Sequence, residues 1–129
     1  NTDYYQLGYA YYKQGEYAKA IAEFNKIIDG KNAVAQNAYY HLGESYLKQD
    51  QKQQALNVFK NASEMDFSAQ IQEDAFYNYA KLSYEIGNAY TSVPQVLTAF
   101  LEKYPQTNNK SEIEDLFNIS PFLSKALGT

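Results

Sequence analysis

Side chains that could perform catalysis or bind a metal are scarce in this sequence. The chain has no cysteine and a single histidine, His41, with Glu44 three positions later. This spacing puts two potential ligands side by side on a helix, but a closed metal site needs about four ligands. A hydrolytic triad would need the same histidine beside a nucleophile, and no serine is framed by glycines. We therefore expect His41 to pack between helices or lie on the surface, and we predict no catalytic residue, no metal and no cofactor.

Two groups of neighbouring carboxylates could be mistaken for acid–base pairs. The first is Glu73 with Asp74, and the second joins Glu112, Glu114 and Asp115. Both lie near the predicted start of a helix, where acidic side chains interact favourably with the helix dipole. The sequence also lacks a glycine-rich loop that could cradle a phosphate. These observations predict a protein that is not an enzyme.

Composition narrows the classes of partner. The chain has 129 residues, of which 45% are hydrophobic, so it can build a continuous core. All eleven basic residues are lysines, and the net charge is −4. Without arginine or a basic stripe, nucleic acid is a poor candidate. No apolar run approaches the length of a membrane span, so direct membrane insertion is not predicted.

An internal repeat determines the predicted architecture. Tyr4-x-x-Leu7-Gly8-x-x-Tyr11 recurs thirty-five residues later, from Tyr39 to Tyr46. Each block is followed by a small residue and then an aromatic residue, Ala20 with Phe24 and Ala55 with Phe59. A period of this length in residues that favour helices indicates stacked helical hairpins. A weaker third copy contains Tyr79, Ala80 and Gly87.

The hydrophobic periodicity and the turn residues predict where each helix begins and ends. Gly15, Asp50 and Gly87 are expected to end helices in the left-handed conformation. Ser92 is a predicted N-cap with Pro94 in the first turn, and Ser111-x-x-Glu114 is a predicted capping box. Ser120-Pro121 is expected to break or kink the last helix. The predicted helices cover about residues 3–14, 17–28, 33–48, 52–64, 70–86, 93–104 and 111 onward.

These residues resemble the tetratricopeptide repeat family over about residues 1–105. The resemblance implies an all-α, right-handed superhelix of three stacked helix-turn-helix hairpins with a C-terminal capping helix. Asn32 departs from the proline that commonly closes such a repeat. The third copy departs further, since Tyr79-Ala80 replaces the Leu-Gly pair. The predicted units are residues 1–32, 33–67, 68–105 and 106–129, the last being a cap or the start of a fourth repeat.

In this family the second face of each first helix lines the concave side of the superhelix. The resemblance therefore implies a tyrosine-rich groove that binds a protein or peptide segment, because tyrosine offers a large ring at low entropic cost. In the alternative, the same tyrosines pack against one another and against neighbouring first helices. The predicted groove residues are Tyr5, Tyr9, Tyr12, Lys13, Tyr40, Glu44, Leu47, Lys48, Tyr77, Lys81, Tyr84 and Glu85.

A second interpretation of the function is structural. The chain opens without methionine and ends at Gly128-Thr129, so we expect a piece of a longer bacterial repeat array. In that case the segment is a spacer, or it self-associates through exposed repeat ends. The composition, with lysine as the only basic residue besides histidine, many tyrosines and no cysteine, resembles that of tetratricopeptide proteins of bacterial cell envelopes. This resemblance slightly favours the periplasm, and the cytoplasm is the alternative location. The sequence does not identify the partner.

Overall fold

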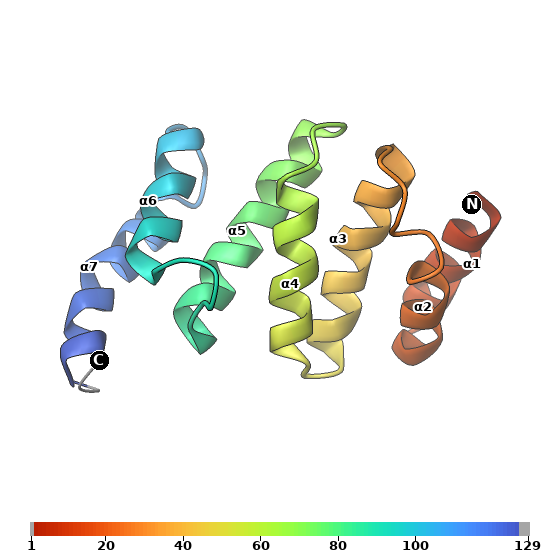
Figure 1. The fold of residues 1–129 in the computed structure, drawn as a ribbon, viewed down its shortest axis with the longest axis horizontal. Helices are drawn as coiled ribbons and strands as arrows, with labels where there is room; N and C mark the ends of the chain where they lie inside the picture. Colours follow the sequence, from red (N-terminus) through yellow and green to blue (C-terminus); the bar gives the residue numbers. More distant parts are fainter. Residues whose placement is uncertain (1, 127–129) are drawn as a thin grey trace. The chain divides into compact units, whose positions relative to one another are not determined.

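The computed structural model describes the backbone of residues 2–126 and the side chains of residues 3–119. Within this range the chain forms seven α-helices and no strand (Figure 1). The fold is therefore all-α, as predicted from the sequence. The helices are α1 (Thr2–Lys13), α2 (Tyr17–Phe24), α3 (Ala33–Lys48), α4 (Lys52–Ser63), α5 (Ala69–Ile86), α6 (Val93–Lys103) and α7 (Lys110–Ala126).

The chain divides into two compact units, Asn1–Tyr79 and Ala80–Thr129. Helix α5 begins in the first unit and ends in the second. In the first unit α2 packs against both α1 and α3, and α3 packs against α4. Figure 1 shows α2, α3 and α4 following one another along this unit. In the second unit α6 packs against α7.

The predicted helix stops are confirmed. Gly15 and Gly87 adopt φ angles of 79° and 83°, and Asp50 adopts 56°. A left-handed residue at the end of a helix frees the chain to reverse, and glycine does so without a steric penalty. The Ser92 side chain accepts a hydrogen bond from the backbone N–H of Gln95, which confirms the predicted N-cap of α6.

The prediction for the end of α2 was wrong by four residues. The helix ends at Phe24 rather than Ile28. Beyond it the backbone tightens, because Lys26 N–H donates to the carbonyl of Glu23 and Ile27 N–H to that of Phe24. Ile27 is nevertheless buried in this turn. The apolar pattern therefore continued past the helix, and periodicity alone extended the prediction too far.

The last helix also differs from the prediction. Helix α7 begins at Lys110, so Ser111 lies inside the helix and is not its N-cap. The first turn forms instead on Asn109, whose carbonyl accepts from Ile113 N–H, while Thr107 Oγ1 accepts from Asn109 N–H. The helix continues without a break past Pro121 to Ala126. The side chains of Ser120 and Pro121 and residues 127–129 lie outside the described residues.

Both repeat glycines lie directly under an aromatic ring of the same hairpin. A Cβ atom added to Gly43 would lie 2.5 Å from the Phe59 ring, and one added to Gly8 would lie 2.8 Å from the Phe24 ring. Such distances are shorter than van der Waals contact, so only glycine fits without a shift of the ring. Phe24 and Phe59 are fully buried, and each fills the space that its glycine leaves.

A buried glutamine fixes the connection between α4 and α5. Gln36 is fully buried on α3, and its Nε2 donates to the carbonyls of Ala62, Met65 and Ser68 at 3.3, 2.6 and 3.4 Å. Its Oε1 accepts from Ser68 N–H at 2.8 Å. A buried amide that satisfies these backbone groups stabilises one conformation of the connection.

The second unit has a smaller core. Val96, Leu97 and Phe100 of α6 are buried, as is Ile113 of α7. Lys81, on the last part of α5, lies 3.6 Å from a carboxylate oxygen of Glu112 on α7. Among the described residues, none of the helices is both long enough and apolar enough to cross a membrane.

Candidate functional site

Aromatic rings from α1 and α3 surround the single histidine. The His41 ring lies 5.1 Å from the ring of Tyr9, 5.2 Å from Tyr12, 5.5 Å from Tyr40 and 6.1 Å from Tyr5, centroid to centroid. The histidine side chain is only 17% exposed. We call these five residues the aromatic cluster. It joins the first helices of the first two hairpins.

Helical spacing explains how α1 supplies three of these rings. Positions 5, 9 and 12 are separated by four and three residues, so their side chains share one face of the helix. Tyr5 stacks on Tyr9 at 6.1 Å, and Tyr9 stacks on Tyr12 at 6.0 Å. Phe24 of α2 lies beneath them, 5.8 Å from Tyr5 and 6.1 Å from His41. The cluster is therefore anchored on the core.

Glu44 holds the polar edges of two of these rings. Its Oε1 lies 2.8 Å from Nδ1 of His41, and its carboxylate also forms a hydrogen bond with the Tyr12 side chain. Both interactions connect partly buried groups, where hydrogen bonds are stronger than in water. Glu44 thus orients a ring from its own helix and a ring from the neighbouring hairpin.

Three tyrosines of the cluster are poor acids. Burial raises the pKa of Tyr5, Tyr12 and Tyr40 to about 12 in each case, and the negative charge of Glu44 adds to the effect. Their hydroxyls stay protonated well above neutral pH, so they can form hydrogen bonds but cannot serve as bases. Burial also raises the pKa of Asp74, with contributions from Glu73 and Glu44. The cluster is suited to contact rather than proton transfer.

The accessible part of this face is smaller than the sequence predicts. Tyr9 is 37% exposed, while Tyr5, Tyr12, Tyr40 and Leu47 are partly buried. These tyrosines therefore combine the two predicted possibilities, since each packs against other rings and keeps part of its surface open. Two lysines complete the accessible surface. Lys13 and Lys48 are exposed in the last turns of α1 and α3, and the Lys13 ammonium lies 5.9 Å from the Tyr9 ring centroid.

The third repeat contributes to both units. Tyr77 lies in the first unit and is partly buried. Lys81, Tyr84 and Glu85 lie in the second unit, where Lys81 pairs with Glu112. Their participation in one groove with the aromatic cluster remains a prediction from the sequence.

Comparison with known families agrees with this architecture. Residues 1–62, which contain α1 to α4 almost entirely, match the family described as "Anaphase-promoting complex, cyclosome, subunit 3", a family of tetratricopeptide-like repeats. Residues 1–62 therefore form tetratricopeptide-like repeats. No curated protein matches the chain. Tetratricopeptide repeats generally mediate protein–protein interactions and are typically non-catalytic.

Sequence reasoning missed the central position of His41 between these tetratricopeptide-like repeats. Packing between helices was among the expectations for this residue, but its contacts with four tyrosines were not. The spacing of Tyr40, His41 and Glu44 indicates contacts within α3 but does not indicate the rings that α1 supplies. In the described part of the chain, no three histidine, cysteine or acidic side chains are grouped so that they could hold a metal ion.

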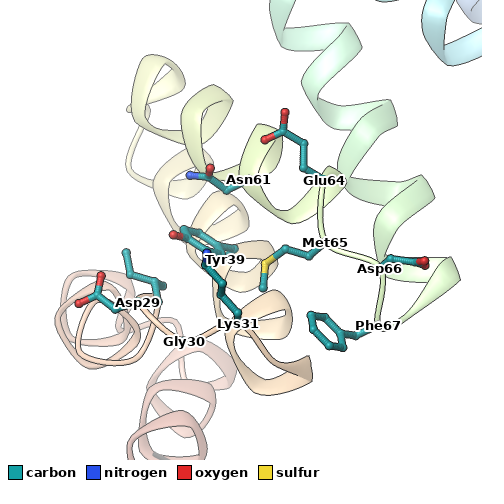
Figure 2. Close-up of a pocket in the computed structure, with 10 residues that line it drawn as sticks. Asp29, Gly30, Lys31, Tyr39, Asn61, Glu64, Met65, Asp66 and Phe67 are labelled. Carbon is teal, nitrogen blue, oxygen red and sulfur yellow. The ribbon is translucent and has the colours of Figure 1, made fainter.

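The first unit also contains a cavity of about 640 Å³, shown in Figure 2, which the sequence did not predict. Its walls come from the turn after α2, from Tyr39, and from the connection that Gln36 holds. In Figure 2 the Met65 side chain points toward Tyr39, whereas Asp66 points away from it. The charged lining residues carry both signs and do not converge on a single group. The lining residues are Ile28, Asp29, Gly30, Lys31, Tyr39, Asn61, Glu64, Met65, Asp66 and Phe67.

Proposed function

We propose that this protein is a non-catalytic interaction scaffold that binds an extended or helical segment of a partner protein on the face formed by the aromatic cluster. The observation that carries the proposal is the arrangement of Tyr5, Tyr9 and Tyr12 around His41. These rings are held in place by stacking and by Glu44, yet Tyr9 keeps more than a third of its surface exposed.

Ordered aromatic rings favour recognition because little conformational entropy remains to be lost on binding. The Tyr9 ring presents an apolar face to a partner side chain and a hydroxyl to its backbone. Interfaces are typically dominated by a few such rings near their centre. We therefore expect Tyr9 to contribute more binding energy than any other residue of this face.

Charge suggests the chemistry of the partner segment. Glu44 is engaged by His41 and Tyr12, and the exposed charges on the Tyr9 side of the cluster are the ammonium groups of Lys13 and Lys48. The partly buried carboxylate of Asp74 lies near Tyr40 instead. A segment that places an apolar or aromatic residue on Tyr9 and acidic residues beside the two lysines would complement this face. The proposed groove continues over Leu47, Tyr77, Lys81, Tyr84 and Glu85 if the hairpins form the predicted right-handed superhelix.

The test begins with a peptide selected from a displayed random library against the full chain. Its affinity is then measured by fluorescence anisotropy for the wild type and for the variant Tyr9→Ser/Lys13→Glu/Lys48→Glu. The three substituted side chains are exposed, so the fold should persist, and circular dichroism checks this. We expect the variant to bind at least about ten-fold more weakly, the size of effect that loss of an interface anchor produces.

A matched control makes the same chemical changes in the second unit. The variant Tyr90→Ser/Lys103→Glu/Lys110→Glu also removes an exposed ring and reverses two exposed lysines. It should bind the selected peptide like the wild type. Unchanged affinity of a folded first-unit variant, or equal loss in both variants, would exclude this face as the binding surface.

A further inference from the structure

The two closely matching copies of the repeat motif differ in what covers the first helix of each hairpin. Leu42 of α3 is fully buried, whereas Leu7, its equivalent on α1, is 43% exposed. Tyr39 is partly buried, whereas its equivalent Tyr4 is 46% exposed. Identical residues at identical repeat positions are thus packed in one hairpin and open in the other.

The difference in exposure extends to two further pairs of equivalent positions on the same face of the helix. Ala38 and Ser45 are fully buried on α3, and the equivalent residues Asp3 and Ala10 are exposed on α1. Positions 3, 7 and 10 follow helical spacing, so Asp3, Leu7 and Ala10 form one continuous strip beside Tyr4. We call Asp3, Tyr4, Leu7 and Ala10 the α1 seat.

The second hairpin shows what covers the equivalent stripe. There α2 lies against α3, and Ala20, Phe24 and Ile27 share a buried cluster with Ala38 and Leu42. The crossing runs antiparallel. Asn25, the C-cap of α2, lies with its Nδ2 3.5 Å from the Tyr46 hydroxyl. Farther along the chain, Ile28 and Asp29 line a cavity together with Tyr39, which lies nearer the N-terminus of α3.

We infer that the α1 seat binds an amphipathic helix of another polypeptide that repeats the α2 pattern. That pattern is a small residue, an aromatic residue four positions later and an aliphatic residue three positions after that, as in Ala20, Phe24 and Ile27. The α2–α3 interface would then continue to the next helix, with the same residue types in contact.

The described helices of a second copy cannot supply this stripe without unfolding. The pattern also occurs as Ala35, Tyr39 and Leu42 on α3 and as Ala75, Tyr79 and Leu82 on α5. In each of these copies, as in Ala20, Phe24 and Ile27, the small and the aliphatic residues are buried in the fold. Helix α7 has exposed Phe117 and Ile119. Residues two positions apart point to different sides of a helix, so they do not form the stripe.

The charge of Asp3 indicates which residue type the C-terminal turn of the incoming helix carries. The α1 seat carries Asp3 where the second hairpin carries Ala38. By the antiparallel crossing, Asp3 faces the C-terminal end of the incoming helix, at the position that Asp29 takes beside Tyr39. A lysine or arginine there would pair with Asp3 and also interact favourably with the C-terminal end of the helix dipole. The expected partner is therefore an α2-like helix with a basic C-terminal turn.

The test uses the full chain and a fluorescent peptide with the sequence of residues 16–29 carrying the change Asp29→Lys. Replacing Ala18 by Glu and Ala22 by Lys, both at exposed positions of α2, allows a side-chain lactam that keeps this short peptide helical. We expect saturable binding by anisotropy. Leu7→Glu in the protein should weaken it at least ten-fold, as should Phe24→Ala in the peptide. The unchanged Asp29 peptide should bind about three-fold more weakly than the Asp29→Lys peptide.

Two controls separate this site from the proposed groove. Ile86→Glu changes another exposed apolar residue and should leave peptide binding unchanged. The variant Tyr9→Ser/Lys13→Glu/Lys48→Glu should also bind the α2-like peptide normally. The measurements can therefore exclude one of the two binding sites without excluding the other.

Three outcomes would overturn the inference. These are absence of binding at about 1 mM peptide, equal binding by a folded Leu7→Glu protein, and equal binding of the Phe24→Ala peptide. Sedimentation of the chain alone adds a fourth. Self-association that Leu7→Glu abolishes would assign the α1 seat to a second copy and not to another polypeptide.

Discussion

The first and second hairpins carry the same Tyr-x-x-Leu-Gly-x-x-Tyr motif, and the difference between them shows what their position in the stack contributes. Helix α3 is packed by α2 on one side and by α4 on the other. The structure describes no helix on the Leu7 side of α1. Leu42 is fully buried in consequence, and Leu7 remains largely open. In a repeat fold, burial therefore depends on neighbours as much as on residue type.

The same comparison applies to the glycines. The Phe59 ring approaches Gly43 more closely than the Phe24 ring approaches Gly8. The contact between glycine and ring is therefore tighter in the second hairpin than in the first, although the motif is shared.

The largest expected effect comes from truncating the two equivalent leucines. Leu42→Ala should lower the free energy of unfolding by about 2–5 kcal/mol, because it leaves a cavity in a closed core. Leu7→Ala should lower it by less than about 1 kcal/mol, since Leu7 is already in contact with solvent. Urea denaturation followed by circular dichroism measures both. Equal losses would show that α1 is covered in solution.

The next effect comes from adding one methyl group to each repeat glycine. Gly43→Ala should cost about 1–3 kcal/mol, because the new Cβ would overlap the buried Phe59 ring. This cost is net of up to about 1 kcal/mol that alanine gains over glycine within a helix. Gly8→Ala should cost about 1 kcal/mol or less, since α1 can move away from α2 on its open side. A larger loss at Gly8 than at Gly43 would contradict the difference in packing.

The smallest effect concerns how the free energy of unfolding depends on pH through the partly buried tyrosines between the two hairpins. Tyr5, Tyr12 and Tyr40 have a pKa of about 12 in the folded protein, against about 10 in an unfolded chain. The folded state then binds more protons than the unfolded state between these values. The stability that the neutral phenols contribute is fully present below about pH 10 and is lost as the pH rises toward 12.

Ultraviolet absorbance of tyrosinate, recorded across this range, should show a group of tyrosines that ionises late. Glu44→Gln should lower the pKa of Tyr12, because it removes a negative charge, although burial remains the larger cause. A Tyr12 pKa that does not fall in this variant would show that Glu44 does not raise it.

Several features were predictable because they depend on local chemistry. The left-handed stops at Gly15, Asp50 and Gly87 follow from backbone sterics, and the Ser92 cap follows from hydrogen bonding within one turn. The two errors in helix bounds have a local cause as well. Ile27 stays buried in a turn, and the first turn of α7 forms on Asn109, two residues before Ser111. The apolar pattern at the end of α2 and the polar pattern before α7 each fit more than one position for the terminus of the helix.

The candidate site was only partly predictable. The spacing of Tyr5, Tyr9 and Tyr12 placed them on one face, as the structure shows, but the ring that they surround belongs to the next hairpin. His41 contacts these rings only because α1 packs against α3. No sequence pattern within either helix specifies that contact.

The sequence by itself determined the helices, the repeat and the family, because these depend on spacing within one or two helices. Tertiary structure alone decided which copy of the motif is covered, that His41 lies among tyrosines, and that Gln36 fixes the connection ahead of α5. These features arise where residues distant in the chain meet. Their free energy depends on the packing of both partners, which neither segment encodes alone.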